Sequence, residues 1–454
     1  MVADVWRWRA SPHASCAEGC QHPLRPLRIT PLAALLITAL VAVLGAPASA
    51  GGLRVMVEPG LSDVFVALVG AYDGALELVD DGADVVLTHG GIDWRDARSV
   101  ALTSEARLTR QVESAEARAF QRFATSPAGQ RSLIEAGLLP DSVTITDQGG
   151  RTFELPQPVE RLASPYALAT YLAYAVGAGD RIVLGNYLGA RDPQGAAAME
   201  RIDPRFRELG TLTPEATTNV EHIASIAPDL VFATAQAEWA VPIRSLGIPV
   251  IGFAGESSEG LREAMRIAGR ALGPDAEARA EAWIAYYDHV LASVERATMG
   301  LESTPNVLFT GTERTRVASG AMYQRALIEA AGGVSVTAHL TGQWNDVDVE
   351  QVLAWNPDVI LVPPYGRASV VAILEDPQWR LLDAVRAGRV LRVPKLVAPW
   401  DTPVPDSVLA IVWLAEQLHG DLREVRCERE TRFFYQRFYG YAISGEEVAA
   451  LCHP

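Results

Sequence analysis

The chain contains very little lysine. Lys395 is the only lysine among its 39 basic residues, and the excess of Asp and Glu gives a formal net charge of −16. An acidic chain without a basic cluster argues against nucleic acid as a partner. The excess of acidic residues most simply forms a solvated, negatively charged protein surface.

The sequence also lacks the short motifs of common hydrolases and nucleotide enzymes. It has no nucleophile elbow, no HExxH and no glycine-rich phosphate loop. Ser, Asp and Glu are present, but none is next to a suitable histidine in sequence. We therefore predict no catalytic residues and no cofactor. An enzyme, or a sensor on the same fold, stays open as an alternative.

The histidines are few and scattered. A zinc or manganese site needs several His and carboxylate ligands that converge on one ion. No such group is visible here, so we predict no site for a bare metal ion. A metal that is already enclosed by a chelator, or an oxyanion, needs no such cluster. The eight histidines are His13, His22, His89, His222, His289, His339, His419 and His453.

One long hydrophobic run is found near the start, from Ile29 to Ala46. Arg25 and Arg28 precede it and Ala48-Ser49-Ala50 follows it, which is the pattern of a secretory signal cleaved after Ala50. A run of about 18 apolar residues could also form an uncleaved membrane anchor. We expect cleavage and a periplasmic protein.

Cysteine is almost absent after this run. Cys16 and Cys20 precede the signal and would be lost with it, which leaves Cys427 and Cys452. In an oxidising compartment the remaining two most simply form one disulfide. Two free thiols are the alternative.

One phrase of the sequence occurs twice. The segment Asn219 to Val231, NVEHIASIAPDLV, recurs as Asp348 to Ile360, DVEQVLAWNPDVI. Each copy predicts a short amphipathic helix that stops before a proline and leads through Pro-Asp into a buried strand. Two such units predict two similar lobes with a cleft between them.

Strands and helices alternate along the chain, which predicts parallel sheets with helical crossovers. A hairpin is expected around Gln148-Gly149-Gly150, and one long helix from Pro274 to Met299 separates the two copies of the repeat. The predicted fold class is α/β, with two Rossmann-like parallel-sheet lobes joined by one long helix and preceded by a small α/β domain. The expected boundaries are 1–50 for the secretory signal with its N-terminal extension, 51–140 for the small domain, 141–273 for the N-terminal lobe, 274–300 for the linker helix, and 301–454 for the C-terminal lobe and tail.

From about residue 141 to 420 the chain resembles the periplasmic binding proteins for ferric siderophores, cobalamin, haem and related metal complexes. The matching phrases are Glu221 to Val231, Glu350 to Ile360, Ala330-Ala331-Gly332-Gly333 and Trp413-Leu414-Ala415. Residues 51–140 resemble a truncated molybdate-type binding protein through a GADV strand and a helix pair around SPAGQ. The resemblance implies a monomeric substrate-binding subunit of an ABC importer, with a membrane permease as its partner.

The resemblance also implies a ligand in the cleft, at the C-terminal ends of the strands. Aromatic rings there could lie on a flat chelate, and arginines could pair with an anionic one. Ordinary packing is the alternative for each residue taken singly. The candidate ligand-binding residues are Ser164, Tyr166, Asn186, Tyr187, Arg191, Gln236, Trp239, Thr312, Arg314, Arg316, Tyr323, Trp344, Tyr365, Arg367 and Trp400.

In the family that the chain resembles, one glutamate on each lobe pairs with arginines of the permease. By position these are Glu221 and Glu350. Two carboxylates on rigid helix starts would orient the protein on a basic rim. The alternative is that each merely favours its helix N-terminus.

The predicted ligand is a metal complex, namely a ferric siderophore, a corrinoid or haem. A molybdate or tungstate oxyanion is the alternative. A tight site of hydroxyl, amide and backbone N–H groups with one arginine would favour the oxyanion. A wide cleft of aromatic rings and arginines would favour the metal complex.

Overall fold

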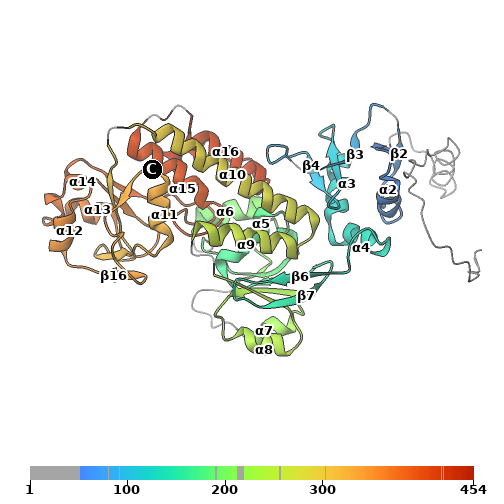
Figure 1. Cartoon of the computed structure of the whole chain (residues 1–454), viewed down its shortest axis with the longest axis horizontal. Helices are drawn as coiled ribbons and strands as arrows, with labels where there is room; N and C mark the ends of the chain where they lie inside the picture. Colours follow the sequence, from blue (N-terminus) through green and yellow to red (C-terminus); the bar gives the residue numbers. More distant parts are fainter. Residues whose placement is uncertain are drawn as a thin grey trace, which may run out of the picture. The chain divides into compact units, whose positions relative to one another are not determined.

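The structure is a computed structural model, shown in Figure 1, and it describes residues 52–453 except 80, 91–92, 190–191, 212–218, 255–256, 302, 421 and 423. The expected secretory signal therefore lies outside the described residues. Within residues 52–453, apart from those gaps, we find no helix that is both long enough and apolar enough to cross a bilayer.

The first sheet has the order β2-β1-β3-β5-β4. The GADV segment, expected to be a strand, leads into β3, which pairs with β1 in parallel. The antiparallel pair formed by β4 and β5 was not predicted. The elements are β1 (Leu53–Val57), α2 (Ser62–Val69), β2 (Leu76–Leu78), β3 (Val85–His89), β4 (Ser99–Ala101), β5 (Ala106–Arg110), α3 (Ala115–Thr125) and α4 (Pro127–Glu135).

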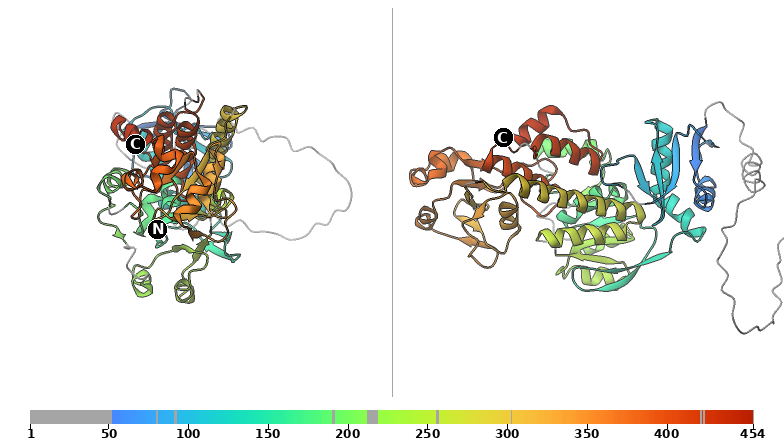
Figure 2. Two further views of the ribbon diagram at one scale, coloured as in Figure 1. Left: turned by 90° about the vertical axis from the view of Figure 1, so that its left-hand side faces the viewer. Right: turned by 45° about the horizontal axis from the view of Figure 1, so that its top comes forward.

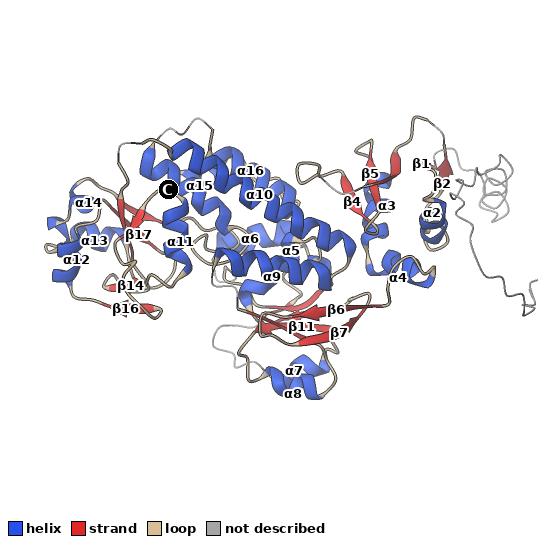
Figure 3. Ribbon diagram, viewed as in Figure 1, coloured by secondary structure: helices blue, strands red, loops and turns tan. Residues whose placement is uncertain are grey.

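The expected hairpin is formed by β6 (Ser142–Thr146) and β7 (Thr152–Pro156), which pair in antiparallel fashion. Asp147 closes its turn, because Oδ1 accepts hydrogen bonds from the backbone N–H groups of Gly149 and Arg151 at 2.9 and 3.0 Å. Oδ2 accepts from the backbone N–H of Gly252 at 2.9 Å. The hairpin is thereby connected to β12, a strand of the N-terminal lobe. Figure 3 shows α7 and α8 below β6, β7 and β11.

The N-terminal lobe is built on a parallel sheet of order β10-β9-β8-β11-β12. Strands β8 and β11 are fully buried over most of their length, as expected for a sheet covered on both faces. The elements are β8 (Leu162–Ser164), α5 (Ala167–Ala175), β9 (Ile182–Gly185), α6 (Pro193–Ile202), β10 (Gly210–Thr211), α7 (Val220–Ser225), β11 (Leu230–Thr234), α8 (Ala240–Ser245), β12 (Val250–Phe253) and α9 (Ser258–Ala271).

The C-terminal lobe repeats this plan with a parallel sheet of order β15-β13-β17-β18 and a small antiparallel pair, β14 and β16. The fold class is therefore the predicted α/β arrangement of two parallel-sheet lobes. The elements are β13 (Asn306–Phe309), β14 (Arg316–Ala318), α11 (Tyr323–Ala330), β15 (Val334–Ser335), β16 (Trp344–Asp346), α12 (Val349–Trp355), β17 (Val359–Val362), α13 (Val370–Glu375), α14 (Asp383–Arg386), β18 (Val390–Arg392) and α15 (Ser407–His419).

The two copies of the repeated phrase form helices with the same N-terminal cap. Asn219 accepts a hydrogen bond from the backbone N–H of His222 at 2.8 Å, and Asp348 accepts one from the N–H of Gln351 at 2.7 Å. A side-chain oxygen at this position satisfies an N–H group that has no partner within the helix.

The two copies also end in the same way. Ala227 and Asn356 have left-handed backbone conformations, with φ of 45° and 39°, and a proline follows each. The next residue then ties its strand to a neighbour: Asp229 Oδ2 accepts from Arg161 N at 2.8 Å, and Asp358 Oδ2 accepts from Asn306 N at 2.7 Å. In both copies the aspartate that follows the proline therefore links the starts of two adjacent strands.

The long helix is α10 (Pro274–Thr298). Trp283, Tyr286, Tyr287 and Val290, which recur at helical spacing, are all buried. They belong to one hydrophobic core that contains strand and helix residues of both lobes. The helix is therefore a core element as well as a connection, and burial of its apolar face on both lobes opposes free hinge motion.

The tail forms α16 (Cys427–Phe438) and α17 (Gly445–Cys452), and α16 lies beside α10 and α15 (Figure 2). The Tyr286 ring lies 5.2 Å from Phe433 and 5.7 Å from Phe438, measured between ring centroids. Arg201 on α6 donates to the Tyr441 hydroxyl at 2.7 Å. The tail thus packs on the long helix and on the N-terminal lobe.

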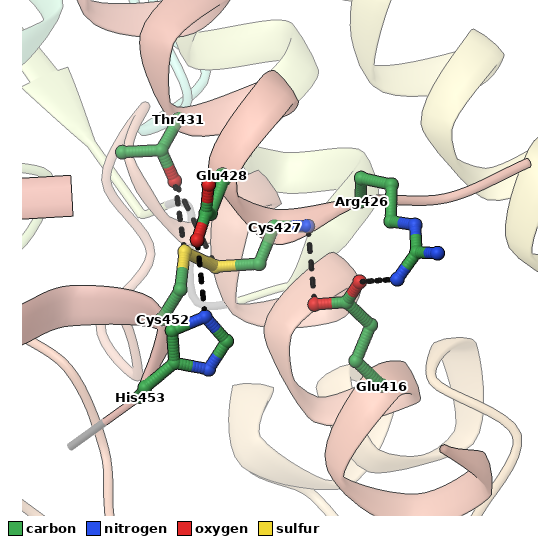
Figure 4. Close-up of a disulfide and its surroundings, with 7 residues drawn as sticks. All are labelled: Glu416, Arg426, Cys427, Glu428, Thr431, Cys452 and His453. Carbon is green, nitrogen blue, oxygen red and sulfur yellow. Dashed lines mark hydrogen bonds and ion pairs between the residues drawn. A yellow bond between two sulfur atoms is a disulfide. The ribbon is translucent and has the colours of Figure 1, made fainter. Parts of the chain in front are cut away.

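The structure joins Cys427 and Cys452 in a disulfide (Figure 4). Both cysteines are buried, and the Thr431 hydroxyl lies 3.7 Å from Cys452 Sγ. The backbone N–H of Cys427 donates to Glu416 on α15 at 3.1 Å. The bond therefore connects the start of α16 to the end of α17, close to α15.

A variant with both Cys427→Ser and Cys452→Ser is expected to lose about 3 kcal/mol of unfolding free energy, because a closed loop spanning 25 residues no longer restricts the unfolded chain. Chemical denaturation followed by circular dichroism measures this loss. A reducing agent should destabilise the wild type by a similar amount and leave the variant unchanged. Equal stability of the oxidised and reduced wild type would contradict the prediction.

Candidate ligand cleft between the lobes

In the N-terminal lobe, hydrogen bonds join the loops that follow β8 and β9. Ser164 at the end of β8 is fully buried, and its hydroxyl accepts from Thr170 Oγ1 at 2.9 Å. The Asn186 backbone N–H donates to Ser164 O at 3.1 Å, and its side-chain amide donates to Pro165 O at 3.0 Å. Tyr166 precedes α5 and is half-buried. The structure thus brings Ser164, Tyr166 and Asn186 together at one edge of the sheet.

In the C-terminal lobe, the loops after β13 and β17 are joined in the same way. Thr312 O accepts from the backbone N–H groups of Arg367 and Ala368 at 2.8 and 2.9 Å. Gly366 has a φ of +84°, and a Cβ there would lie 2.6 Å from Thr312 Cα, so this close contact requires glycine. Trp344 is half-buried, and its ring lies against Gly311. Thr312, Trp344 and Arg367 are therefore neighbours.

The chain between β18 and α15, residues 393–406, connects the two lobes, and we call it the crossing segment. Tyr171 on α5 donates to Val397 O at 2.7 Å, and Trp283 on α10 donates to Pro405 O at 3.3 Å. Lys395 Nζ lies 3.8 Å from Asp192 Oδ2. The only lysine of the chain thus contributes to the contact between the lobes.

The crossing segment carries a buried carboxylate beside the cleft. Asp401 is fully buried, and its Oδ2 accepts from the Tyr365 hydroxyl at 2.6 Å. Its Oδ1 has no hydrogen-bond partner within the described part of the chain. Burial raises the pKa of Asp401 to about 6, although the hydrogen bond from Tyr365 favours the charged form. The pKa of Tyr365 is raised by burial and by the neighbouring carboxylate, so its phenol stays a donor.

A narrow recess marks where the strand ends of the N-terminal lobe meet the crossing segment. It is lined by Tyr166 and Leu168, by Phe253 at the end of β12, and by Pro403. A larger cavity of about 660 Å³ lies elsewhere, between residues 90–143 and the first turns of α10. Apart from Pro403, the residues that line the recess all belong to the N-terminal lobe. The predicted cleft between the two lobes therefore stays a prediction.

Besides Ser164, three aromatic candidate side chains are buried in the core. Tyr187 is buried, with its hydroxyl 3.1 Å from that of Tyr174. Tyr323 is buried, with its hydroxyl 2.7 Å from Ser407 Oγ, and Trp400 has no exposed surface. These three side chains are part of the hydrophobic core. From the sequence alone, a buried aromatic residue of the core could not be distinguished from one that would contact a ligand.

The remaining candidates are spread over the surface. Arg314 pairs with Asp376 at 2.9 Å and Arg316 with Asp346 at 3.6 Å, and the Arg367 side chain is 89% exposed. Gln236 is exposed, whereas Trp239 packs on the apolar cluster of α7 and α8. Arg191 lies outside the described residues.

The two candidate docking glutamates occupy equivalent places. Glu221 is the second residue of α7 and Glu350 the second residue of α12, and both are exposed. Their helices begin with the matched caps of Asn219 and Asp348. Each carboxylate also lies in the favourable field of a helix N-terminus.

Sequence reasoning missed Tyr171 and Asp406. Asp406 is fully buried and accepts hydrogen bonds from the hydroxyls of Tyr435 and Tyr439 at 2.7 and 2.5 Å. The usable signal was an aspartate in the apolar, proline-rich sequence VAPWDTPVPD, because an acidic side chain in such surroundings is usually buried and paired.

The fold is that of a two-lobed α/β protein with one long helix between the lobes. The periplasmic binding protein family model matches residues 165–396, more than half of the chain, and the chain belongs to this family. Within residues 52–453, apart from the gaps given above, no cluster of three or more His, Cys, Asp or Glu could hold a metal ion.

Among characterised proteins, the chain is similar to the molybdate-binding protein MolA of Haemophilus influenzae, with 24% identity over 70% of this chain and 96% of that protein. It is also similar to the vitamin B12-binding protein of Pectobacterium atrosepticum, with 23% identity over 46% of this chain and 72% of that protein.

Two solved structures share the fold. A periplasmic solute binding protein from Veillonella parvula has a TM-score of 0.61 and 24% identity, over 68% of this chain and 96% of that one. MolA of Haemophilus influenzae bound to molybdate has a TM-score of 0.58 and 21% identity, over 66% of this chain and 99% of that one.

Proposed function

We propose that this protein is the substrate-binding subunit of an ABC importer, and that it captures a metal complex in the cleft between its lobes and delivers it to a membrane permease. The ligand class is a ferric siderophore, a corrinoid or haem. In this proposal the protein is a periplasmic monomer exported by the signal in residues 1–50. It has no catalytic activity of its own.

One observation carries the proposal. Half-buried aromatic side chains and a highly exposed guanidinium group, which lies 4.0 Å from Glu313, are found at the strand ends of the lobes: Tyr166 on one lobe, and Trp344, Tyr365 and Arg367 on the other. Aromatic faces suit the flat surface of a macrocycle or chelate, and guanidinium groups suit its carboxylates.

The proposed organisation follows the expected boundaries. Residues 141–273 and 301–454 supply the two walls of the cleft, and residues 274–300 hold them together. Residues 51–140 are an accessory domain in this proposal. Glu221 and Glu350 face the permease, one from each lobe.

A molybdate or tungstate oxyanion is the second candidate ligand. Its support is the similarity to MolA, which extends over 70% of this chain. The recess beside Pro403 is also narrow, which suits a compact ligand, but its lining, which includes Tyr166, Leu168 and Phe253, offers few N–H or O–H groups to an oxyanion.

A binding screen of the mature protein by intrinsic tryptophan fluorescence tests the proposal, with ferric siderophores, cobalamin, haem and molybdate as ligands. We expect one of the metal complexes to quench the fluorescence. Trp344→Phe should remove most of the quenching, because this ring is half-buried at the strand ends. Trp355→Phe, on α12 away from those ends, is the matched control and should retain it.

Arg367→Gln should weaken binding of an anionic complex about tenfold, the effect of losing one charge-assisted contact. Binding of molybdate alone would select the second candidate. Binding of none of the four ligand classes, or equal quenching in both tryptophan variants, would contradict the proposal.

A further inference from the structure

A second cavity, of about 470 Å³, lies away from the cleft. It is formed by two segments that are far apart in sequence, the loop before β4 and the outer face of α16 with the turn that follows it. None of the predicted ligand-binding residues contributes to it. Its volume is within the range of about 300–1,000 Å³ that is usual for small-molecule sites. The lining residues that matter below are Arg95, Arg432, Phe433, Gln436, Arg437 and Ile443.

The floor of this cavity contains a buried guanidinium group. Arg437 is only 4% exposed, and its Nε donates to the backbone carbonyl of Trp94 at 2.8 Å. Its Nη2 is buried and has no hydrogen-bond partner within the described part of the chain. Burial and the nearby Arg279 lower the pKa of Arg437 to about 10, so the group is still charged at neutral pH. A buried charged donor without a partner is costly, and an acceptor in the cavity would satisfy it once the guanidinium group turns toward the cavity.

All the charged side chains that line the cavity have the same sign. Arg95, Arg432 and Arg437 contribute guanidinium groups, and no lining residue is acidic. Arg95 lies over the Trp94 ring at 3.9 Å. Asp93, Asp96 and Asp275 are close enough to Arg437 to favour its charge, but none of them lines the cavity. Three like charges around one space repel each other, in a chain whose net charge is −16. An anion would remove this repulsion.

The rest of the lining is apolar. Phe433 and Ile443 stand beside the arginines, together with two alanines, and Gln436 adds a neutral polar group. Guanidinium groups bind carboxylates through two parallel hydrogen bonds, and the apolar side chains can cover a hydrocarbon body. We propose that this cavity is a second binding site, selective for a small organic carboxylate with an apolar body. The site is independent of the inter-lobe cleft.

Isothermal titration calorimetry with benzoate as the probe tests the site, with benzyl alcohol and inorganic phosphate as comparison ligands. Benzoate should bind the full mature protein, and benzyl alcohol, which lacks the charge, should bind at least tenfold more weakly. Phosphate binding with equal affinity would show that the apolar lining contributes nothing. That result would overturn the proposed selectivity.

Variants connect the binding to the arginines. Arg437→Gln should reduce benzoate affinity at least tenfold. Thermal unfolding will show whether this buried substitution disrupts the fold. If it does, the double variant Arg95→Gln, Arg432→Gln, at two exposed positions, provides the test, and its affinity for benzoate should be about tenfold lower. Arg122→Gln, an exposed arginine on α3, is the matched control and should bind as the wild type does. Undiminished binding in the double variant, or no benzoate binding at millimolar concentrations, would overturn the proposal. Trp344→Phe should leave benzoate binding unchanged, which separates this site from the cleft.

Discussion

A variant with both Glu221→Arg and Glu350→Arg is expected to bind its ligand normally and to lose transport. The two exposed carboxylates are at matched helix starts, one on each lobe. In our proposal each faces an arginine of the permease. Reversal of both charges replaces two attractions by two repulsions, and like charges brought together at an interface cost several kcal/mol.

The expected decrease is about two orders of magnitude in ligand uptake by cells that carry the permease and the variant, because about 2.8 kcal/mol of lost docking energy corresponds to a hundredfold change. Fluorescence titration of the isolated variant should give the wild-type affinity. Glu295→Arg with Glu446→Arg is the matched control: both residues are exposed and the change in net charge is the same. Its uptake should be normal. Normal uptake by the Glu221, Glu350 variant would refute the docking role and leave only the alternative that each carboxylate favours its helix N-terminus.

The two buried aspartates of the crossing segment, Asp401 and Asp406, are expected to make the stability of the protein depend on pH. Replacement of Asp401 and Asp406 by asparagine should stabilise the protein, relative to the wild type, much more at pH 7 than at pH 4. Burial raises the pKa of each carboxyl from an ordinary value of 3.8 to about 6. The folded protein therefore holds these protons at pH values where the unfolded chain has released them.

The sign of the effect follows from proton binding. Between about pH 4 and pH 6 the folded state binds more protons than the unfolded state, so the wild type loses stability as the pH rises through this window. Below about pH 4 the two aspartates cause no loss of stability, and above about pH 6 their destabilising effect has reached its full size. A shift of about 2 pKa units corresponds to about 3 kcal/mol for each aspartate. Asparagine cannot ionise, so the variant avoids this cost.

The measurement is the unfolding free energy of wild type and variant from urea titrations at pH 4, 5, 6 and 7. Other titrating groups are common to both proteins and cancel in the difference. Asp73→Asn, at an exposed position, is the control and should show a difference that does not change with pH. A difference for the double variant that is equal at pH 4 and pH 7 would show that Asp401 and Asp406 are not held in the buried state described above.

Elements with a strong local pattern could be predicted well. The long helix was expected from Pro274 to Met299 and extends from Pro274 to Thr298, because its buried aromatic residues recur at helical spacing. The hairpin around Gly149 was found from its turn residues. The β4–β5 pair was missed. β4 has only three residues, and in β5 the buried positions include Arg110, so the sequence ARLTR does not show the alternation as apolar and polar residues.

The candidate site could be predicted only in part. The strand ends were located correctly enough to place Ser164, Tyr166 and Asn186 together, and likewise Thr312, Trp344 and Arg367. Tyr187, Tyr323 and Trp400 follow strands or precede helices in the same way, yet they are buried, as Ser164 also is. Whether such a side chain faces a cleft or a core depends on what the other lobe places against it, and one segment of sequence does not contain that information.

By itself, the sequence determined the repeated unit, because its cap, its left-handed stop and its Pro-Asp pair are local devices that act within a few residues. It also determined the α/β class through the alternation of buried strands with amphipathic helices. Only the tertiary structure decided which charges are buried and which face each other. Asp401 accepts a hydrogen bond from Tyr365, which is 36 residues away in the sequence, and Arg437 donates one to Trp94, which is 343 residues away. Electrostatic free energies depend on distance and burial in space, and neither follows from distance along the chain.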